Sequence, residues 1–195
     1  MKRHLIFLFI GFFCFVSCEN NNKERLVLQE KEEAKKDMVF KKISESWRFK
    51  TLLISTDAEI LLKNWAQWRL FVNELNQKPT YSLSAFQKKS KTLTKKSQEL
   101  LESVPAEFSA PEFKSRFLVL QTKFQSLELY LNLNTIPPQK VIDLIQEINL
   151  QLNSIELQIN EWARKKQIPL EQGEADMIRM LDTSRAVREK PKNLD

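Results

Sequence analysis

The sequence is almost without glycine: its 195 residues include only Gly11 and Gly173. Tight hairpin turns need residues that adopt positive φ, which glycine does without steric cost. Loops that cradle phosphate groups, such as the Walker and dinucleotide-binding motifs, need several glycines close together. Leu, Lys, Glu and Gln are abundant, and these residues favour helix. The sequence therefore predicts an all-α fold and excludes glycine-loop nucleotide binding.

Prolines divide the chain into long segments whose apolar residues recur at steps of three and four, the spacing of a heptad seam. Four such segments are predicted to be helices, over residues 57–77, 83–103, 111–133 and 138–166. The connections between them are short, which favours antiparallel neighbours. We therefore predict an antiparallel up-down four-helix bundle with additional flanking helical segments.

The apolar seams identify the predicted core, and one of them is weak. The second helix has Ser90 and Ser97 at two seam positions. The other three seams are apolar throughout: Leu61, Trp65, Trp68, Val72 and Leu75; Phe113, Phe117, Leu120, Phe124, Leu127 and Leu131; Val141, Ile145, Ile148, Leu152, Ile155, Ile159 and Trp162.

Helix starts are marked by capping residues. Thr56 with Glu59, and Ser109 with Glu112, have the spacing of a capping box, and Ser82 is the predicted N-cap of the second helix.

The flanks of the bundle are less regular. Residues 23–46 are rich in Glu and Lys and fit a further charged helix, whereas residues 47–55 fit either a helical turn or an extended strap. Residues 174–188 fit a short helix with Met177, Met180 and Leu181 on one face.

The first residues have the pattern of an export signal. Basic Lys2 and Arg3 precede an uninterrupted apolar run over residues 5–16, and the run ends in Phe15-Val16-Ser17-Cys18. A 12-residue helix is about 18 Å long, well short of a hydrocarbon core of about 30 Å, so a cleaved signal fits better than a transmembrane helix.

The four residues that end at Cys18 resemble the lipobox of bacterial lipoproteins, with Phe15 in place of the commoner leucine. The resemblance covers residues 1–18 only. It implies that Cys18 is lipidated, with acyl chains such as palmitate, and that the chain is cut just before it. The predicted organisation is a signal peptide (1–17), a lipidated cysteine and polar tether (18–25), a helical domain (26–188) and a loose C-terminus (189–195).

The residues that are missing exclude several kinds of chemistry. The one histidine, His4, and the two cysteines, Cys14 and Cys18, all lie within the first 18 residues. The rest of the chain therefore cannot form a disulfide, a His/Cys zinc site, a histidine-dependent nucleophile or histidine-ligated haem. Without Lys2 and Arg3 the net charge is +4, too little to predict nucleic-acid binding. We predict no cofactor and no metal; carboxylate chemistry stays open.

Two surface features are candidate binding sites. One is a basic surface on the second helix, suited to anionic headgroups or an acidic partner, although such a face also simply keeps a helix in water; its residues are Lys88, Lys89, Lys91, Lys95 and Lys96. The other is Trp47, which lies outside the strong seams and is the candidate partner-facing aromatic. The tryptophans at 65, 68 and 162 fit core positions, and the acidic cluster Glu171, Glu174 and Asp176 fits solvated surface.

These observations predict a non-enzymatic bundle, lipid-anchored to a membrane of the bacterial envelope, that binds or scaffolds an envelope protein. Inner and outer membrane stay open. Three other functions fit the same residues: an apolar-ligand or lipid binder whose core opens at Ser90 and Ser97, an immunity or exclusion lipoprotein, and an enzyme that uses only carboxylates and lysines.

Overall fold

A computed structural model describes residues 19–50, 52–168 and 172–181. The signal segment, Cys18 and residues 189–195 lie outside the described residues. The described ranges contain helices and no strand, in this order: α2 (Glu19–Ser46), α3 (Thr56–Leu62), α4 (Ala66–Leu75), α5 (Leu83–Glu102), the 3₁₀ turn η1 (Ala106–Phe108), α6 (Pro111–Leu131), α7 (Pro138–Lys166) and α8 (Gln172–Leu181). The predicted all-α class is confirmed.

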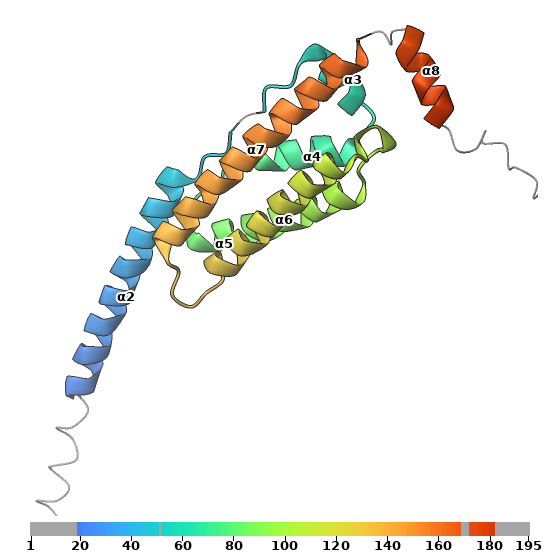
Figure 1. Cartoon of the computed structure of the whole chain (residues 1–195). Helices are drawn as coiled ribbons and strands as arrows, with labels where there is room; N and C mark the ends of the chain where they lie inside the picture. Colours follow the sequence, from blue (N-terminus) through green and yellow to red (C-terminus); the bar gives the residue numbers. More distant parts are fainter. Residues whose placement is uncertain (1–18, 51, 169–171, 182–195) are drawn as a thin grey trace, which may run out of the picture.

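Helices α4, α5, α6 and α7 form an up-down bundle, in which α4 packs on α5, α5 on α6 and α6 on α7 (Figure 1). The hydrogen bonds between α5 and α6 join early residues of one helix to late residues of the other. Gln87 and Thr94 of α5 bind the carbonyls of Leu131 and Phe124 of α6 respectively, so α5 and α6 are antiparallel. Helices α2 and α3 pack on α7.

The predicted seams of α6 and α7 form the centre of the core. All six seam residues of α6 are buried, and so are the seam residues of α7 as far as Ile159, with Trp162 half-buried. Helix α7 has the predicted bounds, and α6 ends two residues early at Leu131. A proline begins each helix, where its missing N–H breaks no hydrogen bond.

The prediction of one helix over residues 57–77 is wrong, because the chain breaks at residues 63–65 into α3 and α4. Trp65 stands at the break with φ −91° and ψ 89°, and its indole N–H donates to Ser103 Oγ at 3.0 Å. The break changes the helical phase. Leu62 and Phe71 are buried where the continuous seam placed Leu61 and Val72.

Both predicted capping boxes are also wrong. Ser55, not Thr56, caps α3, because its hydroxyl accepts from the Ala58 N–H at 3.3 Å. Ser109 instead donates to the carbonyl of Ala106 in η1, so α6 begins without a side-chain cap. The N-cap of α5, Ser82, is as predicted.

Residues 47–55, here called the strap, contain no helical residue among those described and lie along α7. Asn149 donates to the Arg48 carbonyl and accepts from the Lys50 N–H, at 2.9 and 2.7 Å. Asn160 binds the other end of the strap in the same way. The asparagines follow Ile148 and Ile159 in the sequence, so a polar stripe runs along α7 beside its apolar one.

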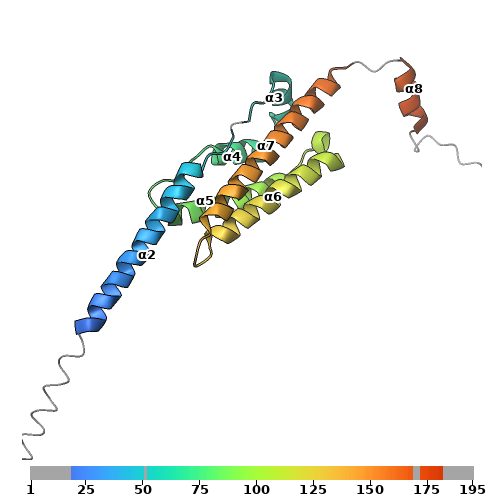
Figure 2. The ribbon, with the colours of Figure 1, turned by 60° about the vertical axis from the view of Figure 1, so that its left-hand side comes forward.

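Helix α2 extends far beyond the bundle, as Figures 1 and 2 both show. Residues 23–38 are all exposed, and packing begins at Val39 and Phe40 and continues to Ile43. The helix already begins at Glu19, so residues 19–25, predicted as a polar tether, are helical. At 1.5 Å per residue its 28 residues span about 42 Å.

Helix α8 lies apart from the bundle in both views. Met177, Met180 and Leu181, predicted to share one face, are exposed by 58%, 88% and 73%. The second part of the predicted helix, residues 182–188, falls outside the described residues. Among the described helices, none is both long and apolar enough to cross a membrane.

Candidate functional site

The structure divides the five lysines of the predicted basic surface into two groups. Three of them have carboxylate partners: Lys89 contacts Glu74 of α4 at 2.6 Å, and Lys96 and Lys95 contact Glu99 at 2.7 and 3.9 Å. Lys88 and Lys91 are exposed, and no carboxylate of the described residues lies within ion-pair distance of either. They are the two free charges of the cluster.

This division follows from the phase of α5. Phe86 and Leu93, seven residues apart, face the core, and Lys89 lies on the flank beside α4, where it is 9% exposed. Its inclusion in an exposed basic surface is therefore wrong. Lys88 and Lys91, three residues apart, lie on the side of α5 opposite Phe86 and Leu93, where both line a groove toward α6 and Lys88 also borders a depression toward α4.

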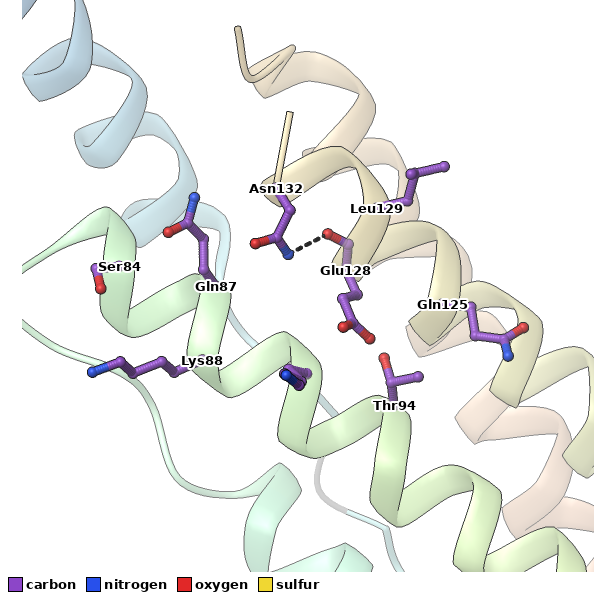
Figure 3. Close-up of a pocket in the computed structure, with 9 residues that line it drawn as sticks. Ser84, Gln87, Lys88, Thr94, Gln125, Glu128, Leu129 and Asn132 are labelled. Atoms are coloured by element: carbon purple, nitrogen blue, oxygen red, sulfur yellow. Dashed lines mark hydrogen bonds between the residues drawn. The ribbon is translucent and has the colours of Figure 1, made fainter. Parts of the chain in front are cut away.

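Lys88 and Lys91 line an open groove of about 650 Å³ between α5 and α6. Figure 3 shows Gln87 on the α5 wall, with Asn132 and Glu128 on the α6 wall. Eight of the nine lining residues carry an amide, hydroxyl or charged group, and the ninth is Leu129. The residues are Ser84, Gln87, Lys88, Lys91 and Thr94 of α5, and Gln125, Glu128, Leu129 and Asn132 on the α6 side.

Hydrogen bonds between the helices hold the groove walls. Gln87 Nε2 donates to the Leu131 carbonyl at 2.9 Å, and Thr94 Oγ1 donates to the Phe124 carbonyl at 3.1 Å. Asn132 Nδ2 donates to the Glu128 carbonyl at 2.8 Å within the end of α6. The amide positions are therefore set before any ligand arrives.

The two seam serines of α5 do not open the core. Ser90 and Ser97 are 0% and 1% exposed. Their hydroxyls donate to carbonyls of their own helix, those of Gln87 and Thr94, both at 2.8 Å. Both hydroxyls are thus satisfied inside the interface, and the small side chains are covered by the neighbouring helices.

A second groove, of about 640 Å³, adjoins the first, because Gln87 and Asn132 line both. Its outer wall is the exposed part of α2, with Glu32, Lys35 and Lys36. Neither of these lysines has an ion-pair partner among the described residues. The rest of the lining comes from α2, the start of α5 and the α6–α7 connection: Val39, Leu83, Leu133, Asn134, Thr135 and Ile136.

Lys95 and Lys96 both form ion pairs with Glu99. The hydrogen bond from Lys96 is the main reason why the pKa of Glu99 lies below its ordinary value. Desolvation opposes this effect, and the positive charges of Lys96 and Lys95 each add a smaller lowering. Glu99 is therefore ionised at neutral pH and neutralises part of the α5 surface next to the groove.

Trp47 is not a partner-facing aromatic. It is 2% exposed and packs edge-on against Phe86 and Phe49, with ring centroids 4.9 and 5.3 Å apart. It follows Ile43 by four residues, so it continues the buried face of α2. The other predicted core tryptophans are placed as expected: Trp65 and Trp68 stack at 5.9 Å and are buried.

A metal site is not assembled in the described part of the chain. No three His, Cys, Asp or Glu side chains there come together as metal ligands. Glu171 and the side chains of Glu174 and Asp176 fall outside the described residues, as does Cys18.

Comparison of the chain with protein-family models, curated proteins and solved structures found no match.

Proposed function

We propose that the chain is a lipid-anchored protein of the bacterial cell envelope, whose helical bundle is a non-enzymatic module that binds or scaffolds another envelope component. The observation that carries the proposal is the basic and apolar leader that ends in Phe15-Val16-Ser17-Cys18. Two or more acyl chains on one cysteine anchor a protein stably, since each buried methylene contributes about 0.8 kcal/mol.

The shape of α2 supports this proposal. The helix begins one residue after Cys18. Its residues 23–38 are all exposed, so no other part of the described structure covers them. A polar helix of this kind serves as a spacer between an anchor and a folded unit. Residues 19–38 would separate the two by about 30 Å.

The bundle supports binding better than chemistry. The free lysines and fixed amides of the α5–α6 groove form an open, polar surface at the end of the bundle where α2 joins it. The apolar-ligand alternative required an opening at Ser90 and Ser97, and both residues are covered. We therefore assign partner binding to the groove.

The anchor is tested by feeding the bacterial host an alkyne-labelled palmitate and following tagged protein in membrane fractions. We expect the label and membrane retention in the wild type and in Cys14→Ser, and loss of both in Cys18→Ser. Cys14 is a matched control because it lies four residues upstream in the same leader. Equal labelling and retention of all three proteins, or no label on any, would show that Cys18 is not lipidated.

The binding role is tested by crosslinking tagged protein in intact cells and recovering it with its partners. We expect one envelope protein at stoichiometric yield with the wild type, and its loss with Cys18→Ser. A wild type that is labelled and membrane-bound yet recovers no protein would contradict a scaffolding role and leave the anchor intact.

A further inference from the structure

The two grooves adjoin one another and are together called the channel. Gln87 and Asn132 line both of them, so a bound chain could pass from Lys91 on α5, across these two amides, to Lys35 and Lys36 on α2. An open channel of this length suits an extended polymer better than a compact small molecule, which binds in enclosed and mainly apolar sites.

The channel has an excess of positive charge. Its lysines are Lys35, Lys36, Lys88 and Lys91, and none has an ion-pair partner among the described residues. Two carboxylates, Glu32 and Glu128, also line it. Four positive against two negative groups favour an anionic ligand.

The carboxylates decide what kind of anionic ligand fits. Glu128 and Glu32 accept hydrogen bonds and repel negative charge, so an anionic polymer without hydrogen-bond donors, such as polyphosphate, meets uncompensated repulsion at both positions. An extended acidic peptide instead has backbone N–H groups to donate to these carboxylates, while its acidic side chains contact the lysines.

The side-chain amides of the channel can also pair with a peptide backbone, because each has both a hydrogen-bond donor and an acceptor. Gln87 uses its Nε2 on the Leu131 carbonyl, which leaves its Oε1 to accept from a ligand. Asn132 has one N–H on the Glu128 carbonyl, and its second N–H and its Oδ1 remain. Gln125 and Asn134 add further groups that both donate and accept. Alternating donors and acceptors match a peptide main chain.

We propose that this channel binds an extended acidic segment of a partner protein. The proposal rests on the proposed function, since it names the chemistry of the partner at the same groove. Lys88 and Lys91 hold acidic side chains, the amides pair with the main chain, and Lys35 and Lys36 contact the end of the segment that lies against α2.

The test uses fluorescein-labelled poly-L-glutamate and the full chain with Cys18→Ser, purified in a non-ionic detergent, with binding followed by fluorescence anisotropy. The groove variant is Lys88→Glu with Lys91→Glu. The matched control is Lys114→Glu with Lys166→Glu, which changes the charge equally on exposed lysines at the opposite end of the bundle. We expect roughly tenfold weaker binding of the groove variant and less than about twofold for the control, since only the former loses two ion pairs.

Parallel titrations use polyphosphate and phosphatidylglycerol vesicles as probes. Binding of either as tight as that of poly-L-glutamate, with the same loss in the groove variant, would replace the peptide by a plain anion or a lipid surface. No binding of poly-L-glutamate to the wild type, or equal loss in both double variants, would overturn the proposal. Should the charge reversal unfold the protein by circular dichroism, Lys88→Gln with Lys91→Gln serves instead, with a smaller loss expected.

The outcome is separate from that of the anchor experiment. Because every protein in the titration carries Cys18→Ser, binding here does not depend on lipid. Loss of labelling at Cys18 with intact peptide binding would contradict the anchor alone, and the reverse result would contradict the channel alone.

Discussion

Two asparagines on α7 hold the strap, and replacing them measures what the strap contributes to stability. Asn149 pairs with the Arg48 carbonyl and the Lys50 N–H at 2.9 and 2.7 Å. Asn160 likewise donates to the Leu53 carbonyl and accepts from the Ser55 N–H, both at 2.9 Å. Each alanine variant therefore removes two hydrogen bonds that join segments about a hundred residues apart.

The expected loss follows from these bonds. Two hydrogen bonds at a net value of about 1 kcal/mol each amount to about 2 kcal/mol. Alanine favours helix over asparagine by roughly 0.5 kcal/mol, which leaves about 1.5 kcal/mol of destabilisation per variant. The asparagines are 11 residues apart, about 16 Å along the helix, and share no partner, so the double variant should lose about 3 kcal/mol. That is a large share of the 5–15 kcal/mol typical of a domain.

Urea unfolding, followed by tryptophan fluorescence and far-UV circular dichroism, gives the free energy of unfolding of each variant. Gln146→Ala is the control, because Gln146 is exposed on the same helix and its replacement changes helix propensity alone. If both asparagine variants came within about 0.5 kcal/mol of this control, the asparagines would not hold the strap, and the account of residues 47–55 would be refuted.

Three further predictions concern the pairs and the core. Glu74→Gln leaves the ammonium of Lys89, which is only 9% exposed, without its carboxylate partner, and should lower the free energy of unfolding by about 1–3 kcal/mol. Lys89→Met keeps the packed aliphatic stem and should lower it by less. A double-mutant cycle measured by urea unfolding checks this order. Glu99 has a lowered pKa in the folded protein, mainly through its hydrogen bond from Lys96, so its stabilisation is present above the ordinary carboxyl pKa and is lost as the pH falls through the lowered value. The difference in urea midpoint between the wild type and Glu99→Gln should therefore shrink on acidification, and a constant difference would contradict the ion pair. Phe124→Ala leaves a cavity at a fully buried position of α6 and should lower the free energy of unfolding by about 3–5 kcal/mol, measured by thermal unfolding. A loss under about 1 kcal/mol would show that Phe124 is not central to the core.

The parts of the fold that the sequence predicts well are those where local and long-range preferences agree. In α6 and α7 a proline begins the helix, and an unbroken apolar seam continues to its end. Burial of that seam requires the same helix that the local preferences favour. Both helices accordingly begin where they were predicted, and their seams are buried as far as Leu131 and Ile159.

The misplaced elements are those in which a tertiary contact overrides the local pattern. A continuous helix over residues 57–77 has good periodicity, yet Trp65 gains more from packing against Phe108 and Phe117 and from donating to Ser103 than from helical geometry. Nothing within residues 57–77 specifies those partners, which come from α5, η1 and α6. The strap is similar, because its hydrogen bonds are to asparagines of α7 that could equally well have faced water.

The candidate site could have been refined from the sequence alone by using the phase of α5. Once Phe86 and Leu93 define the inward face, Lys89 lies three residues from Phe86, on the edge of that face, and is expected to be less exposed than Lys88 and Lys91. A count of five lysines therefore overstates the basic surface, since three of them pair with the two carboxylates of Glu74 and Glu99. The two that remain free line the same groove, and they are joined there by Lys35 and Lys36 from a helix some fifty residues earlier in the chain. Sequence spacing within one helix could indicate the first pair, but only the packing of α2 beside α5 brings the second pair to it.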